Sequence, residues 1–273
     1  MKERIEQAVR SLRGLALGEA YGRRRSRTGD GERGADAGPR PQEGSWPWGD
    51  GTATALSVLS CLAEHGRTDQ EHLAADLAAD GQDGEEPHSS GAAVRVAPLG
   101  AYFADDLGRV PAEAARCAVV THTRPEAVAG AVAVALAAAL AAAGGDRTAP
   151  GRPSFLDQVS ERLEPSEVRS GLRRAARLPA STAPEQAARA LGGGADLSAP
   201  GTVPFALWCA AEGLDDTGGT LRRAVAGTRF PDAASAIAGG VAAARSGVAG
   251  VPQGWRQACA DLPAWVEALS PAR

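Results

Sequence analysis

The sequence predicts an all-α fold, and three of its features support this prediction. Alanine-rich runs whose apolar residues recur at helical spacing make up much of the chain. Aromatic residues are only 4% of the 273 residues, and runs of Val, Ile and Thr bounded by turn residues are scarce. Segments rich in Gly, Pro and charged residues separate the helical runs. This length lies at the upper end of what one domain holds, so we expect a single domain over 1–273.

The first predicted helix covers 4–17, because Ile5 and Val9 begin an apolar face at helical spacing. It leads into GLALGEAYG (14–22), in which a glycine recurs every four positions and so permits close contact with another helix. The next segment, 23–45, is rich in Gly, Pro and charge, and we expect a mobile loop there.

Helical spacing predicts four more helices in the first half of the chain. Their ranges are 50–64, 69–79, 111–120 and 127–143. A polar segment, 80–90, interrupts them, and we expect a second mobile loop there. The run 127–143 is dominated by alanine and is slightly shorter than a membrane span, so we expect a buried central helix and no membrane contact.

The second half of the chain has a weaker helical pattern over 154–191, which ends at a glycine turn, 192–194. Further on, the pair Pro231 and Asp232 is typical of the first turn of a helix, where proline and acidic residues are favoured.

Charge and cysteine spacing exclude several classes of protein. The net charge is −4, so no basic field indicates a nucleic-acid partner. Arginine supplies 28 of the 29 basic residues, a bias typical of GC-rich bacterial coding. The four cysteines form no zinc-binding pattern. The N-terminal segment has no apolar signal core, so we expect a cytoplasmic protein with reduced thiols.

One acidic residue stands out in WPWGDGTATALSVLSCLAEHG, residues 46–66. Asp50 lies between two glycines at the start of a predicted helix. One interpretation is an N-cap, in which the carboxylate accepts hydrogen bonds from the unpaired N–H groups of the first turn. The other is a functional carboxylate in a loop that the glycines leave open.

Several segments together resemble the ADP-ribosylglycohydrolase family. GLALGEAYG is similar to the family's GxALGDAxG, SSGAAVRVAPLG to GNGAAMRVAPLG, THTRPEA to SHTHPxA, and TVPFALW to TVPxALW. These matches occur in the family's order and extend over nearly the whole chain. The resemblance implies a compact all-α domain in which two magnesium ions lie over a cleft that binds ADP-ribose.

The family holds its metals with two motifs, W-T-D-D-T and G-D-T-D-T-T, and this sequence departs from both. On the first motif, WGDGT keeps one carboxylate, Asp50, and has Gly51 at the position of the second. On the second motif, RFPDA keeps Asp232 and has Phe230 at the other Asp position. We therefore expect no resident cofactor, or at most one weakly bound Mg²⁺ at Asp50 and Asp232, because two ions need more than two carboxylates.

The resemblance also implies site residues, each with a plainer alternative. The candidate catalytic residues are Asp50, Asp232 and His122, and the candidate ligand-binding residues are Ser90, Gly91, Trp48, Arg229 and Phe230. Arg229 could fold toward the two aspartates and supply the charge that metal supplies in relatives, or be a solvated loop residue. His122 could act as an acid or base, or be a hydrogen-bonded structural histidine. The two aromatic residues could stack on adenine or ribose, or only pack.

The resemblance and the altered metal motifs leave three possible functions. The first is a degenerate family member, a pseudoenzyme that binds ADP-ribose, a related nucleotide or an ADP-ribosylated protein. The second is a metal-independent enzyme of altered glycosidic or metabolite-tailoring chemistry, in which a carboxylate pair stabilises an oxocarbenium-like state. The third is an active magnesium-dependent ADP-ribosyl hydrolase, which would require a different alignment of both metal motifs.

Overall fold

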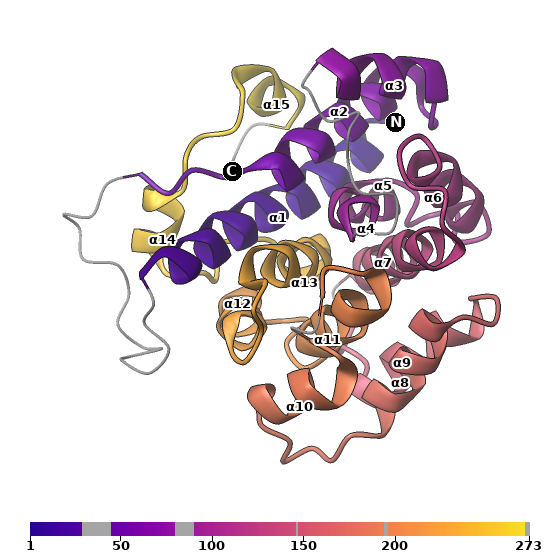
Figure 1. Cartoon of the computed structure of the whole chain (residues 1–273). Coiled ribbons are helices and arrows are strands. Elements are labelled where there is room, and N and C mark those ends of the chain that lie inside the picture. The colour runs from indigo at the N-terminus through magenta and orange to yellow at the C-terminus, as the bar shows by residue number, and fades with distance from the viewer. Residues whose placement is uncertain (29–44, 80–89, 146, 194–195, 271–273) are drawn as a thin grey trace.

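The computed structural model describes residues 1–28, 45–79, 90–145, 147–193 and 196–270. Apart from two isolated backbone bridges, all regular structure in these residues is helical (Figure 1), which confirms the predicted all-α class. The helices of the first half are α1 (Lys2–Thr28), α2 (Asp50–His65), α3 (Gln70–Ala79), α4 (Gly91–Arg95), α5 (Ala97–Tyr102), α6 (Val110–Ala118) and α7 (Pro125–Ala143). The helices of the second half are α8 (Arg152–Glu161), α9 (Glu167–Arg177), α10 (Pro184–Leu191), α11 (Ala199–Ala211), α12 (Thr217–Val225), α13 (Pro231–Ser246), α14 (Gln253–Ala258) and α15 (Ala264–Leu269).

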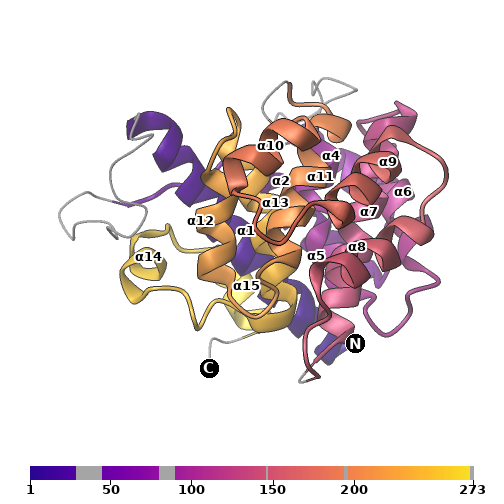
Figure 2. The same cartoon turned by 90° about the horizontal axis from the view of Figure 1, so that it is seen from below.

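The centre of the molecule is an antiparallel pair of helices, α1 and α13, which lie side by side in both views (Figures 1 and 2). A Cβ added at Gly18 would overlap the carbonyl oxygen of Ser235, and one added at Gly22 would lie 2.5 Å from the Cα of Asp232. The Ser235 hydroxyl donates a hydrogen bond of 2.7 Å to the Gly18 carbonyl. The close helix contact predicted from the glycine spacing is confirmed, and the backbones of α1 and α13 touch there.

Helix α7 is the apolar helix predicted for the core. It begins with Pro125 at the first helical position and is the one helix in the described residues that is long and apolar enough to cross a membrane. In the fold, 67% of its most apolar stretch is buried, and it packs against α4, α5, α6, α11 and α13. A buried central helix accounts for this composition.

The predicted loop 23–45 is partly wrong, because α1 continues through Thr28. Arginine makes up most of 23–28 and is a good helix former. Because the preceding turns of α1 are already held by their buried face, the helix continues through these residues. Residues 29–44 of that predicted loop, and 80–89 of the second, lie outside the described residues. The weak pattern over 154–191 contains three helices, α8, α9 and α10, which lie at the bottom of Figure 1.

A second, smaller group of aromatic residues joins the two ends of the chain. The rings of Tyr21 and Trp255 stack with centroids 4.2 Å apart, and Trp46 lies against both. The backbone N–H of Trp46 donates to the carbonyl of Ala258 at 2.6 Å, and the backbone N–H of Ala260 donates to the carbonyl of Trp46 at 3.0 Å. The C-terminal segment therefore fixes the chain just before α2 begins.

Candidate functional site

The N-terminus of α2 is held by a carboxylate from α1. Glu19, which is 5% exposed, accepts hydrogen bonds of 2.9, 3.0 and 2.9 Å from the backbone N–H groups of Gly49, Gly51 and Thr52. The hydroxyl of Thr52 donates to the same carboxylate at 2.6 Å. The first N–H groups of a helix have no partners within it, so Glu19 takes the part of a capping side chain from another helix.

Asp50 itself is exposed and is the first residue of α2. Gly49 occupies the N-cap position and has extended backbone angles, so the interpretation of Asp50 as the N-cap is wrong. Because Glu19 satisfies the donors around it, the carboxylate of Asp50 is not needed for that purpose and faces solvent. It is favourably located at the positive end of the helix dipole.

The two glycines beside Asp50 face side chains that leave them no room. A Cβ added at Gly49 would overlap Nη1 of Arg23, which follows Glu19 by one turn of α1. A Cβ added at Gly51 would lie 2.6 Å from Cγ1 of Val94 and 3.0 Å from Oε1 of Glu19. The side of this loop that could hold a second acidic side chain is thus filled by an arginine, a valine and a carboxylate already in use.

Asp232 approaches the same part of α1. It lies in the first turn of α13, is half-buried, and has its Cα against Gly22. Asp50 is adjacent to the contacts of Glu19 and Arg23, so both predicted aspartates lie beside the short stretch 19–23. The two residues are 182 positions apart in the sequence (232 − 50), and each lies next to a contact of this part of α1.

Helix α4 connects Ser90 and Gly91 to this region. Gly91 is its first residue, Ser90 is buried at its N-cap position, and Val94 one turn later contacts Gly51. The N–H of Ser90 donates to the carbonyl of Leu197 at 2.6 Å. The short helix α4 therefore packs against the start of α2 by the face that carries Val94.

His122 has a different environment. Its side chain is fully buried, and Nδ1 lies 2.7 Å from the hydroxyl of Thr121. That hydroxyl accepts a hydrogen bond of 2.7 Å from Arg95, which also donates to the carbonyl of Cys117 at 3.1 Å. This buried network is the environment of a structural histidine, and it offers no direct contact between His122 and solvent.

The remaining predicted ligand-binding residues lie at the edges of the region. Arg229 is exposed, and no ion pair joins it to Asp50 or Asp232. Phe230 is half-buried at the N-cap position of α13. Trp48 is half-buried, packs against the core, and donates from Nε1 to the carbonyl of Asp261 at 3.4 Å. The arginine that contacts the loop around Asp50 is therefore Arg23.

The thiol of Cys259, whose pKa is affected by the charge of Glu19, is unreactive. Burial, with additional effects of the negative charges of Asp261 and Glu19, raises the pKa of Cys259 to about 12. At neutral pH the thiol stays protonated, and a protonated thiol is neither a nucleophile nor a metal ligand.

The described residues of this region do not fit a centre of two magnesium ions. Magnesium prefers about six oxygen ligands, and a pair of ions needs several carboxylates to offset their mutual repulsion. Among the described residues of this region, Glu19 is already bound to N–H and O–H donors, which leaves the carboxylates of Asp50 and Asp232. Within the described ranges, these two belong to no group of three acidic, histidine or cysteine side chains close enough to share an ion.

A cavity of about 1170 Å³ lies elsewhere, beside the first half of α1. Its lining includes Lys2, Arg10 and Arg13 of α1 together with Arg245 at the end of α13. Because α1 and α13 are antiparallel, this cavity lies near the opposite end of both helices from Asp50 and Asp232. Its volume therefore gives no support to a binding site at those aspartates.

The fold is all-α and is built on the close contact between α1 and α13, with an acidic residue in the first turn of α2 and of α13. These features allow comparison with known families. The sequence profile of the ADP-ribosylglycohydrolase family matches residues 1–272. This protein is a member of the ADP-ribosylglycohydrolase family. A solved structure described as an "ADP-ribosylglycohydrolase-related protein complex" has the same fold, with a TM-score of 0.68, 24% sequence identity, and coverage of 98% of this chain and 97% of that one. A search of curated protein sequences returns no match.

Sequence reasoning missed the parts played by Glu19 and Arg23. Glu19 is part of the GLALGEAYG motif, but its partners are 30 to 33 residues away, at Gly49 to Thr52. Its spacing of four residues from Arg23 was the available signal, because i and i+4 share one face of a helix. The glycine and charge content after Arg23 favours a loop, and a loop would separate Arg23 from the helical face of Glu19.

Proposed function

We propose that this protein is a degenerate ADP-ribosylglycohydrolase, which binds ADP-ribose, a related nucleotide or an ADP-ribosylated protein without a pair of magnesium ions. The observation that carries the proposal is the filled space beside Asp50. Arg23 contacts Gly49, and Val94 and Glu19 contact Gly51, at positions where the family's first metal motif has ligands. A glycine at such a crowded position cannot be exchanged for an acidic ligand without moving its neighbours.

Arg23 gives this region a fixed positive charge. Its Nε is buried and has no hydrogen-bond partner, while Nη1 reaches the backbone of Gly49. A guanidinium remains charged at physiological pH and matches the geometry of phosphate oxygens in a bidentate contact. We therefore propose that Arg23 binds the diphosphate of the ligand.

The carboxylates of Asp50 and Asp232 can still orient a ribose by accepting hydrogen bonds from its hydroxyl groups. Turnover requires more than this. His122 is buried and engaged by Thr121, so it does not provide an acid or base at the solvent-facing side of the region. We therefore propose that the protein binds its ligand without turnover. The alternative function, a metal-independent enzyme, is tested by the experiments below.

The test is calorimetric titration of the purified protein with ADP-ribose, first in chelator and then with millimolar magnesium. We expect binding in chelator and no change in affinity with magnesium. Arg23→Met should weaken binding by about tenfold or more, because charged hydrogen bonds to phosphate are lost. Arg173→Met is the matched control, since Arg173 is an exposed arginine on the distant helix α9.

The same samples should be assayed for release of ADP-ribose from ADP-ribosyl-arginine. Hydrolysis that appears only with magnesium would refute the proposal, and so would hydrolysis in chelator that is lost on Asp50→Ala. Equal binding by the wild type and Arg23→Met would refute the part assigned to Arg23, and a parallel Arg229→Met variant would show whether Arg229 takes that part instead.

A further inference from the structure

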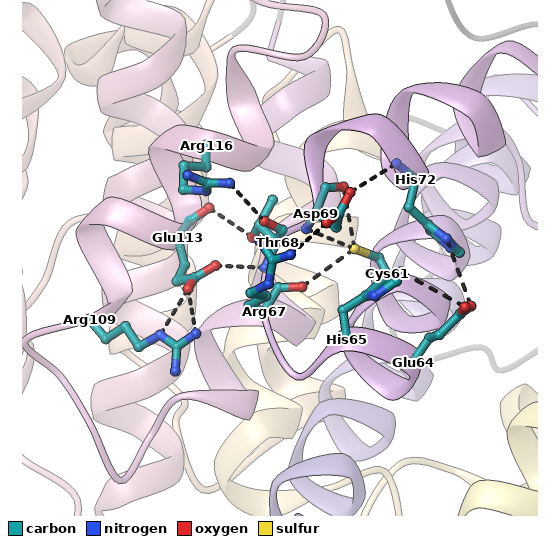
Figure 3. A network of polar contacts seen from close by, with 10 residues as sticks. All are labelled: Cys61, Glu64, His65, Arg67, Thr68, Asp69, His72, Arg109, Glu113 and Arg116. Atoms are coloured by element: carbon teal, nitrogen blue, oxygen red, sulfur yellow. Dashed lines mark hydrogen bonds and ion pairs between the residues drawn. The ribbon is translucent and has the colours of Figure 1, made fainter.

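We propose that Glu64, His65 and His72 form a binding site for a divalent transition metal, with Zn²⁺ as the preferred ion, at the corner between α2 and α3. These residues and their neighbours are drawn in Figure 3. The corner lies at the C-terminal end of α2, 15 residues along the helix from Asp50 (65 − 50), or about 22 Å. The site is therefore independent of the proposed function.

The chain turns sharply to bring the three side chains together. Glu64 and His65 are the last residues of α2, and Gly66 follows with a φ of 65°, in the left-handed region that favours glycine. His72 lies in the first turn of α3, where its N–H donates to Oδ1 of Asp69 at 3.2 Å. A turn of this kind holds the two histidines on the same side of the corner.

A polar network under the corner fixes this geometry (Figure 3). The N–H of Asp69 donates to Sγ of Cys61 at 3.2 Å, which joins the start of α3 to α2. The N–H of Thr68 donates to Oε2 of Glu113 at 2.7 Å, and the hydroxyl of Thr68 donates to the Glu113 carbonyl at 3.1 Å. The ligand-bearing segment is thus attached to both α2 and α6.

The potential ligand atoms are already close to coordination distances. One atom from each of the three side chains lies within 4.8 Å of the others. Nε2 of His65 is 4.0 Å from Oε1 of Glu64, and Nδ1 of His72 is 3.8 Å from Oε2 of Glu64. Bonds of about 2.0–2.2 Å in a tetrahedral zinc site put neighbouring ligand atoms roughly 3.4 Å apart. Small rotations of Glu64 and His65, which are both exposed, can close this difference.

Asp76 favours the tautomer of His72 that binds metal. Its Oδ2 lies 3.3 Å from Nε2 of His72, one turn further along α3, and that nitrogen is shielded from solvent. Nε2 has no hydrogen-bond partner in the structure, so a rotation of the Asp76 side chain is needed to direct a proton on Nε2 at this carboxylate and leave the lone pair of Nδ1 on the side of Glu64 and His65. Metal-bound histidines commonly have such a carboxylate partner on the second ring nitrogen.

The ligand set selects the class of ion. Two imidazoles and one carboxylate suit zinc and neighbouring transition metals, whereas magnesium prefers oxygen ligands alone. Three protein ligands leave at least one position for water, consistent with the exposure of Glu64 and His65. A bound ion would link the end of α2 to the start of α3 and stabilise the corner.

The test uses the full chain without an affinity tag, titrated with Zn²⁺ by calorimetry and with Co²⁺ by visible absorption. We expect one ion per chain, and a Co²⁺ spectrum typical of four or five nitrogen and oxygen ligands. His65→Ala and His72→Ala should each weaken binding by at least about tenfold, and Asp76→Asn by roughly tenfold through the lost orientation of His72. Glu71→Gln is the matched control, because Glu71 is an exposed carboxylate beside His72 and outside the ligand group.

A second readout separates metal binding from misfolding of the variants. Zn²⁺ should raise the Tm of the wild type and of Glu71→Gln, and chelator should reverse this rise. The Tm of His72→Ala should not respond to Zn²⁺, while its circular dichroism spectrum stays that of the wild type. No binding by the wild type at millimolar Zn²⁺, unchanged affinity in both histidine variants, or a thiolate-to-Co²⁺ band from a cysteine would each overturn the proposal.

Discussion

Glu113 is a buried carboxylate whose charge is stabilised by its neighbours. Burial opposes the charged form, but the N–H of Thr68 at 2.7 Å and the guanidinium of Arg109 at 2.7 Å outweigh it and lower the pKa of Glu113 below the ordinary 4.5. A group with a lowered folded-state pKa contributes stability above its unfolded value and loses it as pH falls through the folded value. Glu113 should therefore stabilise the protein at neutral pH and not in acid.

We expect Glu113→Gln to lower the free energy of unfolding by roughly 1.5–3 kcal/mol at neutral pH, the range typical of hydrogen bonds to a charged group. The difference from the wild type should shrink as the pH falls below the ordinary 4.5 and the wild-type carboxylate is protonated. Urea unfolding at neutral and at acid pH measures both effects. Glu161→Gln, at an exposed position of α8, is the control. A difference from the wild type that stays constant with pH would contradict this account.

At the residue scale, the sequence could predict which aspartates remain but not what surrounds them. The motif comparison identified Asp50 and Asp232, and the fold brings both beside α1. It could not identify Arg23 as the arginine at Gly49, because that contact depends on how α1 crosses the start of α2. It selected Arg229 by adjacency in sequence, and the structure leaves this residue exposed.

At the element scale, the α1–α13 contact depends on small side chains. A Cβ at Gly18 would overlap the Ser235 carbonyl and lie 3.1 Å from Cδ2 of Leu221, so the two helices would have to separate. Forcing atoms into a well-packed interface costs roughly 1–3 kcal/mol. We expect Gly18→Ala to reach or exceed the upper end of this range in urea unfolding, although alanine is the better helix former.

Gly254 provides a matched control for this prediction. It is exposed in α14, has no positive φ, and a Cβ added there would meet no atom within 4 Å. Gly254→Ala should therefore leave stability unchanged or raise it by about 0.5 kcal/mol. If both variants behaved alike, the contact at Gly18 would be less tight than the structure indicates.

Helix boundaries were predictable where local signals agree with packing. The predicted range 50–64 became α2, because an apolar face runs up to the turn at Gly66. The end of α1 was not predictable in this way, since charge and glycine content after Arg23 favoured a loop. The convergence of His65 and His72 was also hidden, because it depends on the left-handed turn and the Asp69 contacts between two helices.

At the scale of the whole molecule, one helix is shared by two hydrophobic clusters. Leu12 and Leu15 of α1 belong to the larger cluster, which also contains Trp208. Further along α1, Tyr21 belongs to the smaller cluster, where it stacks on Trp255 of α14. Neither cluster can lose its part of α1 without disturbing the hydrogen bonds of a continuous helix, so their stabilities should be coupled.

This coupling predicts one cooperative unfolding transition for the chain, as expected of a single domain. Because Trp48 packs against the larger cluster, the variant used is Trp208→Phe/Trp48→Phe, in which the three remaining tryptophans report on the smaller cluster and the C-terminal helices. Circular dichroism of the same variant follows the helices of both clusters. Coincident midpoints in urea would support one unit, because α1 transmits the loss of either cluster to the other. A fluorescence transition at clearly lower urea would mean that the C-terminal segment unfolds separately, and the single-domain prediction for 1–273 would then be wrong.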